Sequence, residues 1–338
     1  MTDRRAQGHT AAVPSIAGVP ETVVVAPDSF KGTMPATEVA AALGEGFEQA
    51  GRSVDLCPVA DGGEGTLDAL GGGNRRTVVS GPLGEPVEAA WRLEEDGTAL
   101  IEAALACGLT LAGGAAGNDP LAATSRGVGE LVAAAVAEGA ERIVVAVGGV
   151  ASTDGGVGAW ETVPHPLLVP LVVACDVDAR FLDAADVFAP QKGATPEQVR
   201  VLHERLARLD VPDLPGSGAA GGLAGGLAAI GASLLPGFDL VAERLGFAAR
   251  LAKAALVVTG EGKLDATSFT GKVVGRVLEA AADAGVETLV LVGEVAANSP
   301  IDALSLSERY GPERALAESA DCLAKLVETA LAARRAGP

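Results

Sequence analysis

Three short glycine-rich segments that also carry carboxylates constrain the fold of this chain most strongly. They are residues 60–66 (ADGGEGT), 148–156 (GGVASTDGG) and 259–265 (TGEGKLD), here called the first, second and third glycine–acid segments. The second and third follow apolar, largely β-branched runs, and the first follows a weaker strand candidate. Open α/β sheets bind ligands at such turns, at the carboxyl ends of their strands. Because glycine lets backbone N–H groups approach a phosphate and carboxylates hold Mg²⁺, the segments predict a site for a magnesium-complexed phosphate ligand.

The order of the predicted elements favours an α/β fold with a parallel sheet. A strand at 22–26, a helix at 36–50, a strand at 54–59 and a helix starting at 66–70 give a β-α-β-α beginning. Short strand candidates then follow as in a meander, at 77–79, 85–92 and 100–102. The remaining helices are expected at 125–138, 196–209, 227–232, 273–284 and 312–333, and the remaining strands at 143–147, 171–175, 254–258 and 288–292.

This organisation is best explained by two domains, one inserted into the other. The chain of 338 residues is long enough for both. We expect a Rossmann-like parallel-sheet domain from residues 22–66 plus 260–335, interrupted by a second α/β domain at residues 67–259. Residues 1–21 are polar and patternless and are expected to form a disordered tail rather than a signal peptide.

The composition limits the possible partners. The net charge of −19 argues against binding to nucleic acid or to anionic membrane surfaces. An anionic substrate would therefore need local cations or a metal. No run of 18 apolar residues lacks breakers, and the four cysteines are scattered without metal-site spacing, so we expect a cytoplasmic protein with reduced thiols.

Lysine is scarce, and its placement is informative. Four of the six lysines lie next to a glycine in a motif-like segment, namely Lys31, Lys192, Lys263 and Lys272. A compact ammonium group suits contact with a phosphate. The alternative is chance placement, because lysine is an ordinary loop residue.

The segment after the first predicted strand, residues 26–33 (APDSFKGT), combines several functional groups. Pro27 prevents a helical exit from the strand, and Asp28, Ser29 and Lys31 offer an acceptor, a hydroxyl and a cation. The alternative is a loop in which Asp28 or Ser29 caps the next helix, although a cap does not need a lysine.

The first glycine–acid segment places Asp61 and Glu64 among Gly62, Gly63 and Gly65. Such flexibility is costly unless a ligand binds there, so this segment predicts a site for Mg²⁺ or a substrate hydroxyl. A simple turn that ends in a helix cap is the alternative.

Residues 216–221 (GSGAAG) match the pattern GxGxxG. A dinucleotide-binding fingerprint needs a strand directly before it, but residues 210–215 contain two prolines and two acids. We therefore expect the run, including Gly218 and Gly221, to place a helix N-terminus against a phosphate or to allow close helix packing.

The third glycine–acid segment, with Gly260, Lys263 and Asp265, is followed by Gly271 and Lys272. This pattern is typical of a phosphate and metal loop, but the Walker A spacing is absent.

Taken together, these motifs resemble the bacterial glycerate kinase type 1 family. The matching segments keep the family's order and cover roughly residues 23–330: APDSFKG, ADGGEGT, GPLGEP, NDPLAATSRGVG, the second glycine–acid segment, ACDVD, FAPQKGATP, PGSGAAGG and residues 259–272. The resemblance implies ATP- and Mg²⁺-dependent phosphorylation of D-glycerate, usually to 2-phosphoglycerate. It also implies a two-domain α/β fold with the active site in the cleft between the domains.

Each candidate residue then has an expected role. Phosphoryl transfer needs charge neutralisation and alignment more than covalent chemistry. The catalytic candidates are Asp28, Lys31, Asp154 and Lys272. The substrate- or nucleotide-binding candidates are Ser29, Gly62, Gly63, Lys192, Gly218, Gly221, Gly260 and Lys263. The metal ligands are expected among Asp61, Glu64 and Asp265. The partners expected are glycerate and ATP alone, on a monomer or homodimer.

The chain departs from the family's usual pattern at several positions. Val150 stands where serine is usual, Thr153 where asparagine is usual, Lys263 for arginine and Thr270 for histidine, and residues 161–170 form a shorter connection. One alternative is therefore a catalytically altered or inactive relative that binds a small hydroxy acid or a partner. A nicotinamide-dependent oxidoreductase is a second alternative, and it depends on GxGxxG alone.

Overall fold

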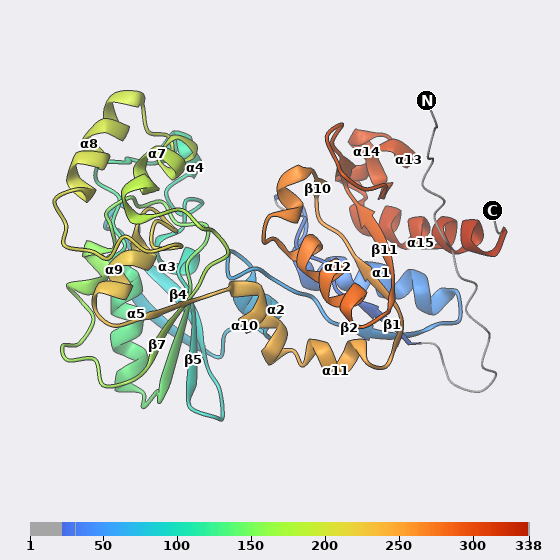
Figure 1. Ribbon diagram of the computed structural model, residues 1–338, viewed down its shortest axis with the longest axis horizontal. Helices are drawn as coiled ribbons and strands as arrows, with labels where there is room; N and C mark the ends of the chain where they lie inside the picture. The colour runs from blue at the N-terminus through green and yellow to red at the C-terminus, as the bar shows by residue number, and fades with distance from the viewer. Residues whose placement is uncertain (1–21, 31, 337–338) are drawn as a thin grey trace, which may run out of the picture.

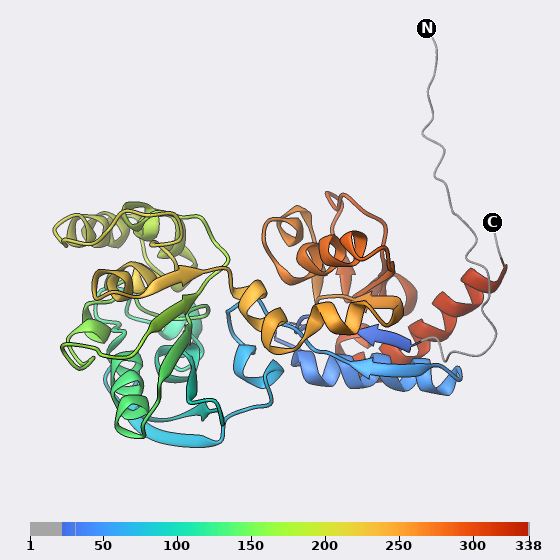
Figure 2. The ribbon, with the colours of Figure 1, turned by 60° about the horizontal axis from the view of Figure 1, so that its bottom comes forward.

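The described residues fold into two large β-sheets with helices packed on them and one small two-stranded sheet, a mixed α/β architecture (Figure 1). The computed structural model describes residues 22–30 and 32–336, so Lys31 and the predicted tail lie outside the described residues. The two sheets lie side by side in both views, with α2 (Thr66–Ala69) and α10 (Gly237–Arg244) between them (Figures 1 and 2). Among the described helices, none has the length and apolar character needed to cross a bilayer.

The first sheet is parallel throughout, in the order β13–β11–β9–β1–β2. Its strands are β1 (Thr22–Val25), β2 (Ser53–Leu56), β9 (Ala254–Thr259), β11 (Glu287–Val292) and β13 (Leu304–Ser305). Val23 and Val25 pack against one layer of helices, and Val24 packs against the other. Helices on both faces explain why β1 is apolar at nearly every position.

The helices of the first layer are α1 (Ala36–Gln49) and α15 (Ser319–Ala336), which also pack on each other. The second layer comprises α10, α11 (Phe247–Leu251) and α12 (Val273–Asp283). The small elements near this sheet are β10 (Lys263–Leu264), β12 (Glu294–Val295), α13 (Leu306–Tyr310) and α14 (Pro312–Ala317).

The second sheet has the order β3–β4–β5–β6–β7–β8 and mixed direction. Its strands are β3 (Arg75–Ser80), β4 (Pro86–Leu93), β5 (Thr98–Glu102), β6 (Arg142–Ala146), β7 (Leu171–Ala174) and β8 (Ser233–Leu235). The first three strands are antiparallel neighbours, as the predicted meander requires, and β5 to β8 run parallel.

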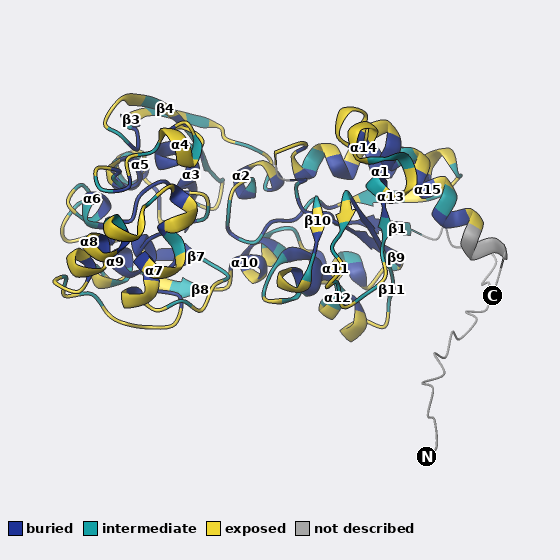
Figure 3. Cartoon of the chain, turned by 90° about the horizontal axis from the view of Figure 1, so that it is seen from above, coloured by how far each residue is buried: buried dark blue, intermediate teal, exposed yellow. Residues whose placement is uncertain are grey.

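Helices also cover both faces of the second sheet. The larger apolar core lies under α3 (Ala104–Cys107), α5 (Arg126–Ala137), α6 (Val157–Trp160) and α9 (Leu223–Ala229). Leu67 of α2 and Leu240 of α10 pack on the other face. At the far end lie α4 (Gly114–Gly117), α7 (Ala184–Phe188) and α8 (Pro196–Leu206). The inner strands β1, β5, β6 and β7 are largely buried, whereas the outer faces of the helices are exposed (Figure 3).

Several boundaries differ from the sequence prediction for local reasons. The expected helix 312–333 is two helices, because the chain leaves helical geometry at Glu318 (φ −125°, ψ 37°). The helix expected at 227–232 begins four residues earlier, at Leu223, directly after Gly222 in a left-handed conformation. The elements that the sequence analysis missed are short, and they include β8, α10 and α11.

The position of β9 bears on the domain boundary. β9 pairs with β1 and β11 in the first sheet, and α10 and α11 also pack on that sheet. We therefore propose that the inserted segment ends before α10 rather than at residue 259. The division of the chain into two domains is itself a proposal.

Candidate active site

Two cavities lie near the carboxyl ends of strands from the two sheets. The first, of about 660 Å³, is lined by residues from both sheets, among them Asp28, Asp61, Gly62, Gly63, Glu64, Gly148, Val150, Asp176, Lys192, Ala220 and Lys272. The second, of about 370 Å³, is lined among others by Ser29, Phe30, Glu261, Lys263, Asp265, Lys272 and Leu316. Lys272 lines both cavities, which are therefore neighbours.

The strand order of the first sheet explains why loops of this sheet contribute residues to the two cavities. The chain runs from β1 to β2 on one side and from β9 to β11 and β13 on the other, so the strand order reverses between β1 and β9. Open α/β sheets bind ligands at such a reversal. The loops after β1 and β9 carry Asp28 and the third glycine–acid segment, and the amide of Asp28 donates to Gly260 O at 2.9 Å.

The first and second glycine–acid segments are in direct backbone contact. Gly148 N donates to Gly62 O at 3.4 Å, and a Cβ added to Gly148 would lie 2.5 Å from the Cα of Gly63. A Cβ on Gly237, at the start of α10, would lie 2.1 Å from Asp61 O. Glycine is therefore required here for backbone packing, in addition to any contact with a ligand.

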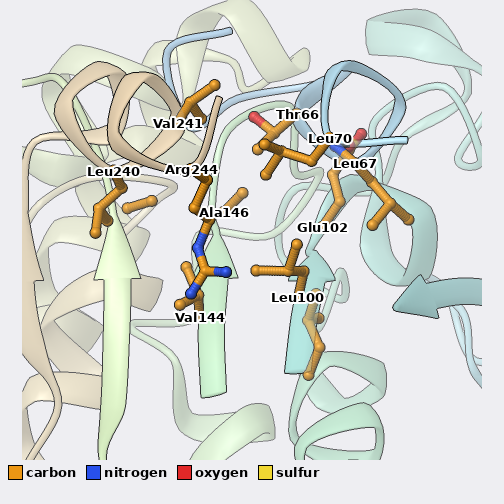
Figure 4. A pocket seen from close by; sticks show the side chains of 12 residues that line it. Thr66, Leu67, Leu70, Leu100, Glu102, Val144, Ala146, Leu240, Val241 and Arg244 are labelled. Carbon is orange, nitrogen blue, oxygen red and sulfur yellow. Dashed lines mark hydrogen bonds between the residues drawn. The ribbon is translucent and has the colours of Figure 1, made fainter. Parts of the chain in front are cut away.

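Glu102 holds the first glycine–acid segment in place, and the sequence analysis missed it. It rises from the end of β5 toward the start of α2 (Figure 4), is 3% exposed, and accepts hydrogen bonds from Gly65 N (3.0 Å) and Leu67 N (2.9 Å). Burial raises the pKa of this carboxyl group. The signal in the sequence was a single acid at the end of an apolar strand.

The space drawn in Figure 4 is a packing gap rather than a substrate site. It measures about 20 Å³ and is lined mainly by apolar residues of α2, α10 and the second sheet. Arg244 crosses it and pairs with Glu94.

Asp154 is engaged by the protein itself. Its Oδ2 accepts from Ser125 N and Oγ, both at 2.8 Å, and from Gly158 N at 3.2 Å, while its Oδ1 accepts from Gly156 N at 3.1 Å. These bonds tie the second glycine–acid segment to the start of α5. The geometry favours a positioning role over the predicted catalytic one, and Asp154 is not among the residues that line either cavity.

Asp176 is a cavity residue that received no role in the sequence analysis. It follows β7, and its carboxylate accepts from Gly237 N and Phe238 N, both at 2.8 Å. Burial, with a contribution from the nearby charge of Asp61, raises the pKa of Asp176 to about 6. The repeated acids of the segment ACDVD could have drawn attention to it.

The structure does not bring the three predicted metal ligands together. Asp61 and Glu64 line the first cavity, whereas Asp265 lines the second. Asp265 Oδ1 accepts from Thr267 N (2.7 Å) and Oγ1 (2.6 Å), and these bonds lower the pKa of Asp265. Within the described residues, no group of three or more His, Cys, Asp or Glu side chains is arranged to hold a metal ion.

The described candidate lysines have different surroundings. Lys192 is 4% exposed, and its Nζ donates to Ser152 O at 2.6 Å. Lys272 is partly exposed directly before α12, and its Nζ donates to Thr267 Oγ1 at 2.8 Å. Lys263 lies in the second cavity, 3.6 Å from Glu294.

The remaining predicted residues fall into packing and lining positions. Ser29 lines the second cavity, and its amide donates to Asp28 Oδ1 at 2.6 Å. A Cβ on Gly260 would lie 1.7 Å from Leu291 O, and one on Gly218 would lie 2.2 Å from Arg180 O, so these two glycines serve close packing. No strand lies directly before residues 216–221, so the geometry of a dinucleotide fingerprint is absent from this part of the described chain.

Comparison with known proteins identifies the family. The model of the glycerate kinase family matches residues 23–165 and 160–332. The chain is 37% identical over 303 residues to the glycerate 2-kinase of Escherichia coli strain K12. This alignment covers 74% of this chain and 79% of that protein. It is also 37% identical over 329 residues to the glycerate kinase of Bacillus subtilis strain 168, with coverage of 82% and 86%.

The chain belongs to the glycerate kinase family. As a member of this family it is a kinase. The fold also matches the crystal structure of a Salmonella typhimurium LT2 protein that is provisionally named glycerate kinase 2, with a TM-score of 0.77 and 33% sequence identity. The match covers 94% of this chain and 99% of that chain.

Two of the departures from the expected glycerate kinase pattern lie in the wall of the first cavity. Val150 and Thr270 both line it, and Val150 is 2% exposed. Val150 presents an apolar surface where a serine hydroxyl was expected. Thr153 is buried, and its hydroxyl has no hydrogen-bond partner among the residues that the structure describes.

Proposed function

We propose that this member of the glycerate kinase family catalyses the ATP- and Mg²⁺-dependent phosphorylation of D-glycerate to 2-phosphoglycerate, as a cytoplasmic enzyme. The observation that carries the proposal is the position of Lys272, which lines both neighbouring cavities. A kinase must bring two anionic substrates together, and a cation between their sites neutralises charge where the phosphoryl group moves.

We place the nucleotide in the second cavity. This cavity lies at the reversal of strand order between β1 and β9, where α/β sheets bind nucleotides. Ser29, Lys263 and Lys272 supply a hydroxyl and two cations toward the phosphates, and Leu316 belongs to an apolar side that suits a base. Lys272 directly precedes α12, so a phosphate beside it also meets the N-terminus of an 11-residue helix.

We place glycerate in the first cavity. Asp28, Asp61 and Asp176 line this cavity and can accept hydrogen bonds from the hydroxyl groups of the acceptor. Asp28 is the candidate that orients or deprotonates the reacting hydroxyl, because it lies at the strand reversal beside the nucleotide cavity.

The donor set of the first cavity fits Mg²⁺. Asp61 and Glu64 supply hard carboxylate oxygens, and the small number of protein ligands suits an ion that keeps several of its waters. When bound, Mg²⁺ would neutralise charge on the transferred phosphoryl group. The contribution of the chain is to fix these two carboxylates, which it does through the glycine contacts at Gly148 and the hydrogen bonds to Glu102.

The variant Lys272→Met tests the site. Removing one preorganised charge at a phosphoryl-transfer site typically lowers kcat by about 10²-fold or more. We expect that loss in a coupled assay of ADP release with D-glycerate. Lys253→Met, an exposed lysine away from both cavities, is the matched control and should behave as wild type. If the activity of Lys272→Met stays within threefold of wild type, the proposed role of Lys272 between the two substrates is wrong.

A further inference from the structure

Lys192 lines the first cavity, and its buried ammonium group feels the charge of Asp154 only from beyond ion-pair distance. Its side chain is 4% exposed, and its Nζ donates to the carbonyl of Ser152 at 2.6 Å. No Asp or Glu in the described part of the chain forms an ion pair with it. Burial lowers the pKa of Lys192 to about 8. An unpaired buried charge is unfavourable, so this position is arranged for an anion that comes from outside the chain.

The turn at Ala220 and Gly221 lies next to the same ammonium group. Gly221 has φ +69°, and a Cβ added to it would lie 2.9 Å from Lys192 Nζ. The preceding residue, Ala220, lines the cavity with φ +57° and is the one non-glycine residue with positive φ among those described. This conformation is strained for an alanine and is found mainly where function requires it.

The amides of Ala220 and Gly221 donate to no acceptor among the residues that the structure describes. Successive free N–H groups in such a turn form a concave anion-binding site. The buried ammonium group therefore lies next to a turn with two free amides, and Lys192 and Ala220 line the same cavity.

We propose that Lys192 and the amides of Ala220 and Gly221 bind the carboxylate of the acceptor, and so select a hydroxy acid over a neutral polyol. This inference rests on the proposed function, because it assigns one group of the proposed substrate to one wall of its cavity.

The distribution of charge favours a carboxylate over a phosphate at Lys192. Lys263 and Lys272 are available for the phosphates in the second cavity. Among the residues that the structure describes, the charged ones that line the first cavity are, apart from Lys192 and Lys272, Asp28, Asp61, Glu64 and Asp176. These carboxylates suit hydroxyl groups and a metal but repel an anionic group, so the acceptor's own charge is matched at Lys192.

The test is calorimetric binding of D-glycerate and of Mg-ADP to Lys192→Met, with Lys253→Met as the matched control. A hydrogen bond to a charged group contributes ~1.5–3 kcal/mol, so we expect the Kd for D-glycerate to rise about 10- to 150-fold. The Kd for Mg-ADP should stay within about threefold of wild type. Weakened Mg-ADP binding with unchanged glycerate binding would place a phosphate at Lys192 and overturn the proposal.

A second measurement needs only the wild-type protein and so does not depend on the folding of a variant. D-glyceramide has nearly the shape of D-glycerate but no charge, and glycerol lacks the carboxyl group altogether. We expect wild type to bind both at least about 10-fold more weakly than D-glycerate, by the same hydrogen-bond energy. Equal affinity for glyceramide and glycerate would refute the carboxylate site.

The two proposals fail in different ways. If D-glycerate binds in a Lys192-dependent manner but is not phosphorylated, the proposed carboxylate site is supported and the proposed kinase reaction is refuted. If glycerate is phosphorylated and Lys192→Met binds it as tightly as wild type, the proposed reaction is supported and the proposed carboxylate site is refuted.

Discussion

Replacing Glu102 with glutamine should loosen the first glycine–acid segment without changing its own residues. In wild type, each carboxylate oxygen of Glu102 accepts one backbone N–H, from Gly65 at 3.0 Å and from Leu67 at 2.9 Å. Glutamine keeps one acceptor oxygen and places an NH₂ group where the second acceptor was. One of the two backbone donors is then left without a partner.

The expected size follows from two opposing effects. An unsatisfied buried donor costs ~1–3 kcal/mol. Against this, the raised pKa shows that ionised Glu102 is itself disfavoured by burial, and a neutral glutamine escapes that cost. We therefore expect Glu102→Gln to lower the free energy of unfolding by about 1–2 kcal/mol, at the lower end of the range for a broken buried network.

The pH dependence of this difference has a definite sign. Because the folded-state pKa of Glu102 is raised, wild type loses stability as the pH rises from the ordinary glutamate pKa through the folded-state value. Glutamine does not titrate. The stability advantage of wild type over Glu102→Gln should therefore shrink as the pH rises through this window.

The assay is urea unfolding at several pH values, combined with steady-state kinetics. Since Asp61 and Glu64 depend on this segment, we expect kcat/KM to fall about 10-fold, as for a positioning residue whose loss lowers metal affinity or activity. Glu95→Gln, on an exposed neighbouring turn, is the control. A Glu102→Gln protein as stable and as active as Glu95→Gln would refute the reasoning.

Two further predictions follow from the site. Asp154→Asn should lower the free energy of unfolding by ~1–3 kcal/mol, because an amide cannot accept all four hydrogen bonds of the carboxylate. A variant that unfolds like wild type but has lost all activity would instead support a direct catalytic role for Asp154. The KM for D-glycerate should rise above pH 8, about tenfold per pH unit, as Lys192 loses its proton, and the rise should be absent in Lys192→Met. The other ionisable groups that act on Lys192 are Asp154 and Cys107, and burial raises the pKa of Cys107, so its thiol stays neutral over this range. A KM that is flat from pH 7 to 10 would contradict the assignment.

The sequence was most informative where local chemistry and topology agree. Asp28 follows the first predicted strand, and Asp61 and Glu64 lie in the glycine turn after the second; the structure places all three in the wall of one cavity. The alternation of apolar runs with helical patterns likewise predicted the mixed α/β fold and the meander of β3 to β5. These features depend on residues that are close together in the sequence, so they can be predicted from one sequence alone.

Residues whose role depends on distant partners were not accessible in the same way. Glu102 acts on Gly65 from 37 positions away, and Asp154 reaches Ser125 across 29 positions. Sequence spacing alone does not show that such groups meet. The same limit applies to Asp265, which shares the glycine-rich context of Asp61 but faces a different cavity.

The central claim is tested most directly by ³¹P NMR of wild-type protein incubated with Mg-ATP and D-glycerate. We expect ADP and 2-phosphoglycerate to form together, with no phosphorylated product when D-glycerate is replaced by glycerol. Formation of ADP without a phosphorylated glycerate, or no turnover in the presence of all three components, would contradict the proposed function and would favour a catalytically altered or inactive member of the family.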